Sequence, residues 1–250
     1  MNNGVIIDVK SLTKRYKNTH TVAVNDLCLK VTNGEIFGLL GPNGAGKTTT
    51  ISILCNVISA TSGEIKINGI NLKSDAHSIK KIIGVVPQEI ALFSNLTAYE
   101  NLRYFGNMYG LTGSYLKERI SSLLEIFGIA HKAHEKISTF SGGMKRRLNL
   151  ITGILHTPKI LFLDEPTVGI DVQSRTVIID YLLSINKLGT TIIYTSHHMD
   201  EAEKFCSKVA VIDMGKIIVE GSPQDLINNY SSCDNLEDIF LEITGRSLRD

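Results

Sequence analysis

The most chemically specific stretch of the sequence is glycine-rich and spans residues 41–49, GPNGAGKTT. It satisfies the pattern G-x-x-x-x-G-K-[ST], with an apolar run before it and a helical pattern after it. Glycines let successive backbone N–H groups converge on a phosphate, while a lysine supplies charge and a hydroxyl suits Mg²⁺. An ordinary strand-to-helix turn is the weaker interpretation, because both flanks fit a phosphate loop. We expect phosphate contacts from Gly41, Pro42, Asn43, Gly44, Ala45, Gly46, Lys47, Thr48 and Thr49, with Thr48 also on the metal.

Two consecutive acids, Asp164 and Glu165, follow the apolar run KILFLD and form a second constellation. We expect the carboxylate of Asp164 to hold Mg²⁺ through water. Glu165 then points elsewhere, where it can orient or deprotonate a water that attacks the γ-phosphate. A solvated acidic turn is the competing interpretation, which the upstream phosphate loop disfavours. Two acids with different roles predict hydrolysis of a nucleotide rather than its storage.

The segment TFSGGMKRRL has the features of a second helix start that could receive an anion. Ser141 can donate its hydroxyl, and Gly142 and Gly143 allow backbone N–H groups to approach. A simple N-capped amphipathic helix is the alternative, but it leaves the paired glycines unexplained, since glycine in a first turn is costly. The next three residues are interpreted as a solvated basic face of the helix: Lys145, Arg146 and Arg147.

The elements that position these residues are short apolar runs separated by helical patterns. Near-continuous apolar runs are typical of strands buried on both faces of a parallel sheet, and the helical patterns between them indicate a doubly wound α/β core. The N-terminal 35 residues and residues 62–69 have instead the pattern of antiparallel strands. The core strands are predicted at 35–40, 82–86, 159–164, 190–195 and 208–213.

Residues from about 97 to 156 change character, with three helical stretches and no convincing strand between them. In the last stretch one face is apolar at helical spacing, and it is formed by Met144, Leu148, Ile151 and Leu155. We interpret the region as a helical subdomain, at about residues 89–156, inserted into the sheet domain. Residues 223–250 are predicted to form a short helical tail.

Composition narrows the classes of protein to consider. The chain has 250 residues, 43% of them apolar, and its 26 basic and 25 acidic residues leave a net charge of +1. That balance argues against a dedicated nucleic-acid binder and against a polybasic membrane anchor. The start lacks a signal-peptide core, and no apolar run approaches the ~18 residues of a membrane helix. If a membrane is involved, another chain must therefore supply it.

Cysteine and histidine spacing gives little sign of a metal centre. The four cysteines are scattered without a CxxC pair, which predicts reduced, packed thiols in a cytosolic protein. His131 and His134 have metal-compatible spacing, but a surface turn is favoured because no further ligands are nearby.

Together these motifs resemble those of the nucleotide-binding subunit of ABC transporters. The segments GPNGAGKTT, VPQ, FSGGM, ILFLDEPT, GID and TSHHMDEAE occur in that family's order and spacing over essentially the whole chain. The resemblance implies a P-loop NTPase fold with a mostly parallel central sheet, an N-terminal antiparallel β-subdomain and the inserted α-helical subdomain. It assigns an ABC ATPase domain to residues 1–222, followed by the tail, with ATP and Mg²⁺ as cofactors.

The resemblance also implies that two such subunits pack head to tail around each ATP. Ser141, Gly142 and Gly143, the signature segment, would then contact the ATP held by the partner's phosphate loop. Asp171 of GID would act across the same dimer. The chain departs from the family pattern at Met144, where glutamine is usual, and at Val172, where proline is usual. Neither position supplies phosphate or Mg²⁺ ligands, so activity is expected to survive.

Three further site residues follow from the resemblance. Gln88 is expected to reach Mg²⁺ or the attacking water, although alone it would be an ordinary loop glutamine. His197 is expected to bond the γ-phosphate and support Glu165, although a lone histidine is usually structural. Tyr16 resembles the aromatic residue that stacks on adenine, with an edge-strand tyrosine as its rival interpretation.

The remaining implications concern partners. In the family a groove near residues 88–97 receives a coupling helix of a membrane permease, and Ile90, Ala91, Leu92 and Phe93 would suit it unless they pack locally. The segments YENLRYFGNMYGL and LEDIFLEITGRSLRD resemble export-type ATPases of the drug-resistance and ABC-2 group. The expected function is ATP-driven export of a drug, lipid or polysaccharide, as a homodimer on a permease at the cytoplasmic side of the membrane, without nucleic acid. The alternative is a soluble ABC-type ATPase that acts as a regulatory switch.

Overall fold

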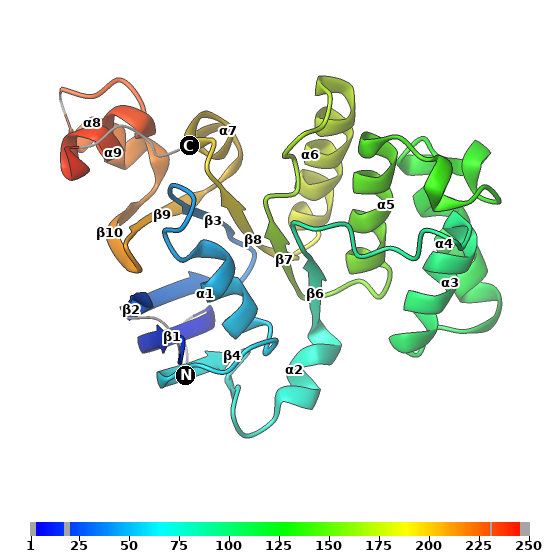
Figure 1. The fold of residues 1–250 in the computed structure, drawn as a ribbon, viewed down its shortest axis with the longest axis horizontal. Helices are drawn as coiled ribbons and strands as arrows, with labels where there is room; N and C mark the ends of the chain where they lie inside the picture. The colour runs from blue at the N-terminus through cyan, green and yellow to red at the C-terminus, as the bar shows by residue number, and fades with distance from the viewer. Residues whose placement is uncertain (1–3, 18–20, 231, 246–250) are drawn as a thin grey trace.

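A computed structural model of the chain describes residues 4–17, 21–230 and 232–245. Residues 1–3 at the start of the expected ATPase domain and residues 246–250 at the end of the expected tail lie outside the described residues, as do residues 18–20 and 231. Within the described chain two β-sheets lie on either side of helix α1 (Lys47–Leu54), which contacts both of them (Figure 1). The helix that follows the phosphate loop is therefore held from two directions.

The larger sheet has six strands in the order β10-β9-β3-β8-β7-β6. The pairs from β9 to β6 are parallel, and β10 joins β9 antiparallel. All five core strands predicted from the sequence are confirmed to within one residue at each end, whereas β10 was not predicted. The strand bounds are β3 (Ile36–Leu40), β6 (Ile83–Val86), β7 (Ile160–Asp164), β8 (Thr191–Ser196), β9 (Lys208–Asp213) and β10 (Lys216–Gly221).

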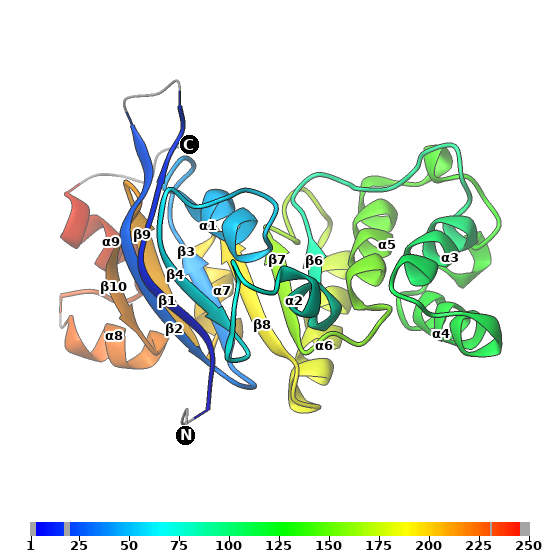
Figure 2. The same ribbon diagram turned by 90° about the horizontal axis from the view of Figure 1, so that it is seen from below.

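The smaller sheet confirms the antiparallel pattern predicted for the N-terminal region. Its order is β2-β1-β4-β5, and every pair in it is antiparallel. Figure 2 shows this sheet on the near side of α1. Its strands are β1 (Val5–Arg15), β2 (Val22–Thr32), β4 (Ser62–Ile67) and β5 (Ile70–Asn71).

Strands of the larger sheet send alternate side chains into two separate cores, as the period of a strand requires. Phe37 and Leu39 pack with α1 and the antiparallel sheet. Leu40 and Leu163 join the core that lies against the helical region on the other face. Burial on both faces explains why these strands are apolar throughout their length.

Between β6 and β7 the chain forms the three helices predicted for this region, on the right of Figure 1. Thr97 begins the first of them with a capping box, in which its side chain and that of Glu100 bond each other's backbone N–H groups. Leu148, Ile151 and Leu155 are fully buried and Met144 half-buried, as their shared face predicts. The elements are α3 (Ala98–Met108), α4 (Gly113–Ile126), the 3₁₀ turns η1 (Ala130–Lys132) and η2 (Ile137–Thr139), and α5 (Gly142–Ile154).

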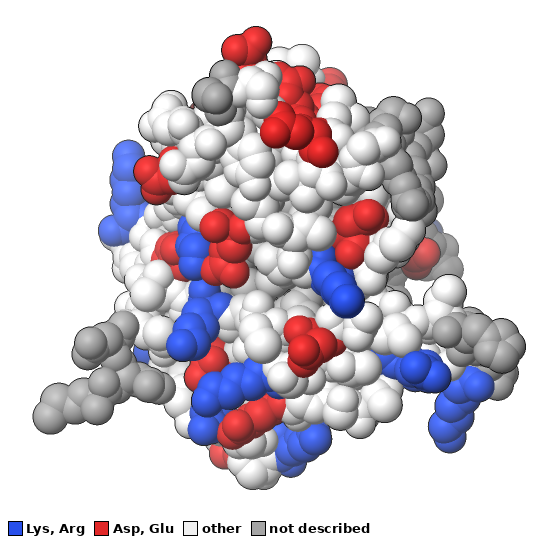
Figure 3. All heavy atoms as spheres, turned by 90° about the vertical axis from the view of Figure 1, so that its left-hand side faces the viewer, with Lys and Arg blue, Asp and Glu red and all other residues white. Residues whose placement is uncertain are grey.

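The C-terminal helices fall where the tail was predicted and pack against the body of the molecule. Helix α8 contacts β10, while α9 contacts α7 and α8. In the view of Figure 3, acidic side chains gather toward the top of this end, and basic side chains lie mostly in the lower half, among further acidic ones. The described residues 223–245 contain no lysine or arginine. The remaining helices are α2 (Ala76–Ile82), α6 (Val172–Lys187), α7 (Met199–Phe205), α8 (Pro223–Asn229) and α9 (Leu236–Thr244).

One part of the cysteine prediction is wrong. Three of the four thiols are buried, but Cys28 is exposed, because Leu27 and Leu29 beside it on β2 take the inward positions.

No helix in the described part of the chain has the length and apolar character needed to cross a bilayer.

Candidate nucleotide-binding site

The phosphate loop joins β3 to α1, and its own packing requires two of its glycines. A Cβ atom on Gly41 would lie 2.1 Å from the carbonyl oxygen of Ile212, and one on Gly46 would lie 2.4 Å from that of Ala23. Gly44 differs, because it has a φ of +81° and open space around its Cα. Gly41 and Gly46 are thus needed for the fold itself, and Gly44 for a backbone turn that faces open space.

Helix α1 begins with its first-turn N–H groups available to an anion. Its N-cap, Gly46, provides no side-chain cap, and the first hydrogen bond of the helix runs from Thr50 N to Gly46 O. A hollow of about 240 Å³ lies over this end and is lined by Ala23, Asn43, Gly44, Ala45, Gly46, Lys47, Thr48, Thr49, Gln88 and Glu165. Uncapped N–H groups, a lysine and the helix dipole fit the phosphates of a nucleotide.

Lys47 is buried at the floor of this hollow, with 5% of its surface exposed. Its Nζ donates to the carbonyl oxygens of Gly41 (2.8 Å) and Pro42 (3.2 Å) and lies 3.3 Å from Glu165 Oε1. Burial lowers the pKa of the lysine, and the negative charge of Glu165 opposes that shift. The cation is thereby fixed beside the catalytic acid predicted from the sequence.

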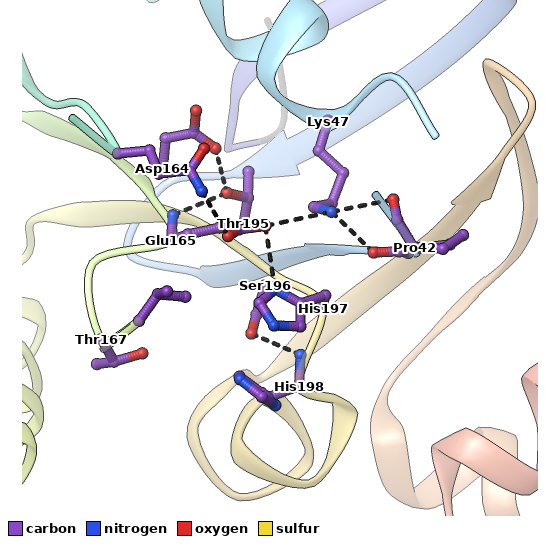
Figure 4. A network of polar contacts seen from close by, with 12 residues as sticks. Pro42, Lys47, Asp164, Glu165, Thr167, Thr195, Ser196, His197 and His198 are labelled. Atoms are coloured by element: carbon purple, nitrogen blue, oxygen red, sulfur yellow. Dashed lines mark hydrogen bonds and ion pairs between the residues drawn. The ribbon is translucent and has the colours of Figure 1, made fainter. Parts of the chain in front are cut away.

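Glu165 is the centre of the polar network in Figure 4. Besides Lys47, its carboxylate accepts a hydrogen bond from Gln88 Nε2 (3.0 Å) and lies 3.2 Å from His197 Nδ1, a close contact rather than a well-aligned hydrogen bond. Its backbone is in the left-handed region at φ +47°, which is uncommon outside glycine and costs about 1–3 kcal/mol. The fold therefore brings together four residues that the sequence analysis assigned to one site.

Thr195 holds both acids and was missed by the sequence analysis. Its hydroxyl donates to Asp164 Oδ1 (2.6 Å) and accepts from Glu165 N (3.1 Å). Thr195 is the β8 partner of Asp164 in the sheet register, and it is fully buried. A hydroxyl at the end of an apolar strand was the only signal of this role, and it gains meaning only when β7 and β8 are known to be neighbours.

The residues predicted to hold Mg²⁺ line one hollow of about 310 Å³, next to the phosphate loop. They are Thr48, Gln88 and Asp164. Hydroxyl, amide and carboxylate oxygens are the ligands that Mg²⁺ prefers. The donor set therefore fits the metal.

A buried network, also missed, ties the loop after Glu165 to α7. Tyr194 donates to Glu201 Oε1 (2.7 Å), Thr167 donates to Glu201 Oε2 (3.1 Å), and the two hydroxyl groups are 3.0 Å apart. Burial, reinforced by Glu201, raises the pKa of Tyr194 well above its ordinary value, so the phenol stays protonated as a donor. The network fixes the turn that carries His197 relative to the loop that carries Glu165.

The signature segment begins α5 at the surface. Ser141 is exposed, and its hydroxyl accepts from Met144 N (3.3 Å) as a helix cap. A Cβ on Gly142 would meet nothing within 4 Å, but one on Gly143 would lie 2.7 Å from Ser174 Oγ and 3.0 Å from Asp171 Oδ2. Packing against α6 thus explains Gly143, while the open space at Gly142 remains consistent with an approaching anion.

Asp171 caps helix α6 within its own chain. Its two carboxylate oxygens accept from Ser174 N (2.8 Å) and Ser174 Oγ (2.9 Å), and these bonds lower its pKa. Its expected action across a dimer stays a prediction. Within the described chain, the signature residues Ser141, Gly142 and Gly143 contribute nothing to the lining of the phosphate-loop hollow.

The prediction of a solvated basic face on α5 is wrong for two of its three residues. Arg146 is half-buried and donates to the carbonyl oxygens of Gln88 and, over 3.4 Å, of Val168. Arg147 is also half-buried and donates to Phe127 O (2.8 Å). Carbonyl groups of neighbouring loops surround this side of the helix, so the guanidinium groups turn inward to satisfy them.

Two buried asparagines, also missed, hold the segment that follows Gln88. Asn149 accepts from Ala91 N (3.1 Å) and donates to Pro87 O (3.3 Å), and Asn101 accepts from Phe93 N (2.8 Å). Of the four apolar residues predicted to meet a partner, Ile90, Ala91 and Phe93 are exposed, whereas Leu92 packs against the core. The backbone of the loop is therefore tied to α5 and α3, and its outer side is apolar.

Tyr16 lies next to the phosphate loop and not on a sheet edge. Its hydroxyl is 3.4 Å from Thr49 Oγ1, and 42% of its surface is exposed. Strand β1, which it follows, lies between β2 and β4, so the edge-strand interpretation is wrong. Stacking on adenine stays a prediction.

His131, His134 and His198 are exposed, as the favoured interpretation of a surface turn predicts for the first two. In the part of the chain that the structure describes, no three His, Cys, Asp or Glu side chains gather closely enough to hold a metal.

A strand that runs into an uncapped glycine loop and helix, with a buried lysine facing two acids, defines a P-loop nucleotide-binding protein. The chain belongs to the ABC transporter family, whose sequence model matches residues 24–168, more than half of the chain.

Two curated relatives are close in sequence. The linearmycin resistance ATP-binding protein LnrL of Bacillus subtilis is 47% identical over 98% of this chain and 76% of its own. The Nod factor export ATP-binding protein I of Cupriavidus pinatubonensis is 40% identical over 93% of this chain and 71% of its own.

Solved structures show the same fold. An ATP-binding subunit of an ABC transporter has a TM-score of 0.87 at 26% identity, and the match covers 96% of this chain and 99% of that one. The ATP-binding cassette MJ0796, described as a dimer in a post-hydrolysis state with ADP and Pi, has a TM-score of 0.80 at 25% identity over 86% of this chain and 98% of its own.

Proposed function

We propose that the chain is the ATP-binding and ATP-hydrolysing subunit of an ABC exporter that works through a separate membrane permease. The convergence of Lys47, Gln88 and His197 on the carboxylate of Glu165, at the mouth of the phosphate loop, carries this proposal. A binding module without chemistry would have no use for a buried, strained glutamate at that point. The names of the relatives, which are resistance and export proteins, support export.

Each side chain of the site has a role that its contacts support. The phosphate loop and Lys47 would bind the phosphates, and the lysine would then share its charge between them and Glu165. Thr48, Gln88 and Asp164 would hold Mg²⁺, which when bound spreads the charge of the phosphates. Glu165, steadied by His197 and Gln88, would orient a water and accept its proton.

A second copy of the chain would complete the site. Ser141 and Gly142 are exposed at the start of α5, with open space around Gly142, and belong to a helix end that can bind an anion. The dimeric state described for MJ0796 supports pairing of two subunits, which would pack head to tail. ATP between two copies would then favour the closed dimer, and hydrolysis would release it.

The membrane permease would dock on the apolar outer side of the loop after Gln88. Ile90 and Phe93 are exposed there, and Phe93 packs edge-on against Tyr104 with ring centres 5.0 Å apart. This contact would hold the subunit at the cytoplasmic side of the membrane. The substrate class we propose is a drug, lipid or polysaccharide.

Substitution Glu165→Gln tests the hydrolytic role. We expect ATP binding to be retained and turnover to fall by about 10²-fold or more, because the amide cannot accept the proton. Size-exclusion chromatography with ATP should then show a long-lived dimer. The double variant Glu165→Gln/Ser141→Arg should remain monomeric while still binding ATP. Unchanged hydrolysis by Glu165→Gln would remove Glu165 from its role.

Substitution Phe93→Asp tests the docking of a permease. It places a charge on an exposed apolar position, so we expect the subunit to leave the membrane fraction of its native host while its ATP affinity is unchanged. The matched control is Tyr115→Asp, at another exposed aromatic residue, on α4. Equal membrane association of the wild type and Phe93→Asp would contradict docking at this loop. A wild type found without any membrane association would favour the soluble switch.

A further inference from the structure

Arg146 reaches the two loops that flank Glu165. Its guanidinium donates to Gln88 O and to Val168 O. Both carbonyls belong to residues that are themselves bonded to Glu165, since Gln88 Nε2 donates to the Glu165 carboxylate (3.0 Å) and Val168 N donates to Glu165 O (3.4 Å). One side chain of α5 therefore holds the catalytic glutamate through its neighbours on two sides.

Asn149, three residues further along the same helix face, makes this attachment rigid. It is fully buried and bonds the backbone on both sides of Gln88, at Pro87 O and at Ala91 N. The Gln88 loop therefore cannot shift relative to α5 without breaking hydrogen bonds of buried groups, which are costly to leave unpaired.

We propose that Arg146 is a positioning residue for hydrolysis, through which the helix that begins with the signature segment sets Gln88 and Glu165 in the site of its own chain. The inference rests on the proposed function. Its physical basis is the planar fork of the guanidinium group, which presents separate N–H donors to two carbonyl groups at once. A movement of α5 caused by the partner's ATP at Ser141 would thereby reach the catalytic acid of the other site.

The basic residues on either side of Arg146 provide matched comparisons on the same turn. Lys145 makes no hydrogen bond or ion pair within the described residues, although it carries the same charge. Arg147 donates to Phe127 O at the end of α4, away from Glu165. Substitutions at the three positions therefore distinguish three effects: loss of charge at Lys145, loss of packing against α4 at Arg147, and loss of the bonds to Gln88 and Val168 at Arg146.

The test uses the full-length chain and measures steady-state ATP hydrolysis, equilibrium ATP binding and thermal unfolding. For Arg146→Met we expect kcat to fall about tenfold with KM for ATP unchanged, because displaced catalytic groups slow chemistry without weakening ground-state binding. Arg146→Lys, which keeps the charge and can reach one carbonyl, should show an intermediate kcat and a wild-type unfolding temperature. Lys145→Met should stay within about twofold of the wild type, as expected for a half-buried charge without a hydrogen-bond or ion-pair partner among the described residues.

A double-mutant cycle with Gln88→Ala distinguishes positioning from general destabilisation. If Arg146 acts through Gln88, Arg146→Met should lower kcat much less in the Gln88→Ala background than in the wild type. A folded Arg146→Met or Arg146→Lys with wild-type kcat would overturn the inference, as would equal fold losses in both backgrounds. Absence of ATPase activity in the wild type would instead refute the proposed function.

Discussion

Two helix N-termini of this molecule are proposed to bind phosphate, and they differ in how many of the required groups come from the same chain. The start of α1 has a buried lysine, two acids and a hollow lined by residues of the same chain. The start of α5 is exposed, is capped by its own Ser141, and has open space at Gly142. The start of α1 therefore lies in a hollow with buried polar groups, whereas the start of α5 lies on the exposed surface.

The two helix starts also differ in what requires their glycines. Gly41 and Gly46 of the phosphate loop cannot carry a side chain because the backbone of the same chain is too close. In the signature segment, a Cβ on Gly143 would meet side-chain oxygens of Ser174 and Asp171, whereas one on Gly142 would meet nothing within 4 Å. Because no contact within the described chain and no positive φ accounts for Gly142, we expect the external ligand to approach at this position.

The largest expected effect is a difference in ATP affinity between Lys47→Ala, at the start of α1, and Ser141→Arg, at the start of α5. Loss of the buried lysine should weaken ATP binding by an isolated subunit by about 100-fold, because a charge-assisted contact to phosphate contributes roughly 3 kcal/mol. Ser141→Arg should leave that affinity unchanged and abolish ATP-driven dimerisation. Calorimetry for binding and light scattering for dimerisation check the two outcomes, and weakened monomer binding by Ser141→Arg would break the distinction between the two ends.

A smaller effect is expected from alanine at the paired signature glycines. Gly143→Ala forces a methyl group against Ser174 and should destabilise the fold by about 1–3 kcal/mol, the usual cost of overpacking. Gly142→Ala has space and a better helix former, so the fold should be as stable as the wild type or more so. Its dimer should nevertheless be weaker if an anion approaches there. Chemical denaturation with and without ATP measures both, and equal destabilisation by the two substitutions would contradict the assignment.

The smallest expected effect is a pH dependence of the free energy of unfolding that arises from His156, near the C-terminal end of α5. His156 lies just beyond that end, bonds Ile83 O through Nε2 (2.9 Å) and stacks on Tyr109 with ring centres 3.6 Å apart. Burial lowers the pKa of His156, and the bond to Ile83 opposes the shift. The unfolded chain therefore takes up a proton first as pH falls below about 6.5, so the free energy of unfolding decreases from there down to the folded pKa.

Replacement by glutamine removes this titration. The difference in unfolding free energy between the wild type and His156→Gln should shrink as pH falls from 7.5 to 5.5, as measured by urea denaturation at each pH. A difference that stays constant over this range would show that the burial of His156 has no effect on its proton affinity. The signature segment at the start of α5 should be unaffected by this substitution at all these pH values.

Local patterns in the sequence were sufficient for most of the fold. The five core strands followed from short apolar runs, and three helical stretches between about residues 97 and 156 were predicted where the structure has α3, α4 and α5. Strand β10 was missed because its residues are only half-buried and carry no such pattern. Lys47 and Glu165 were found from the glycine-rich loop and the paired acids themselves, whereas Gln88 and His197 were found because their positions repeat those of a known family.

The sequence by itself was enough to predict the chemistry, since a glycine loop, a lysine and paired acids indicate phosphate binding and hydrolysis. The tertiary structure alone decided what holds those groups in place. Thr195 is 30 positions from Glu165 and Arg146 is 58 from Gln88, and each pair meets only because the strand order and the packing of α5 bring their segments together. Such contacts depend on the closure of long loops around a common core, which no local pattern encodes.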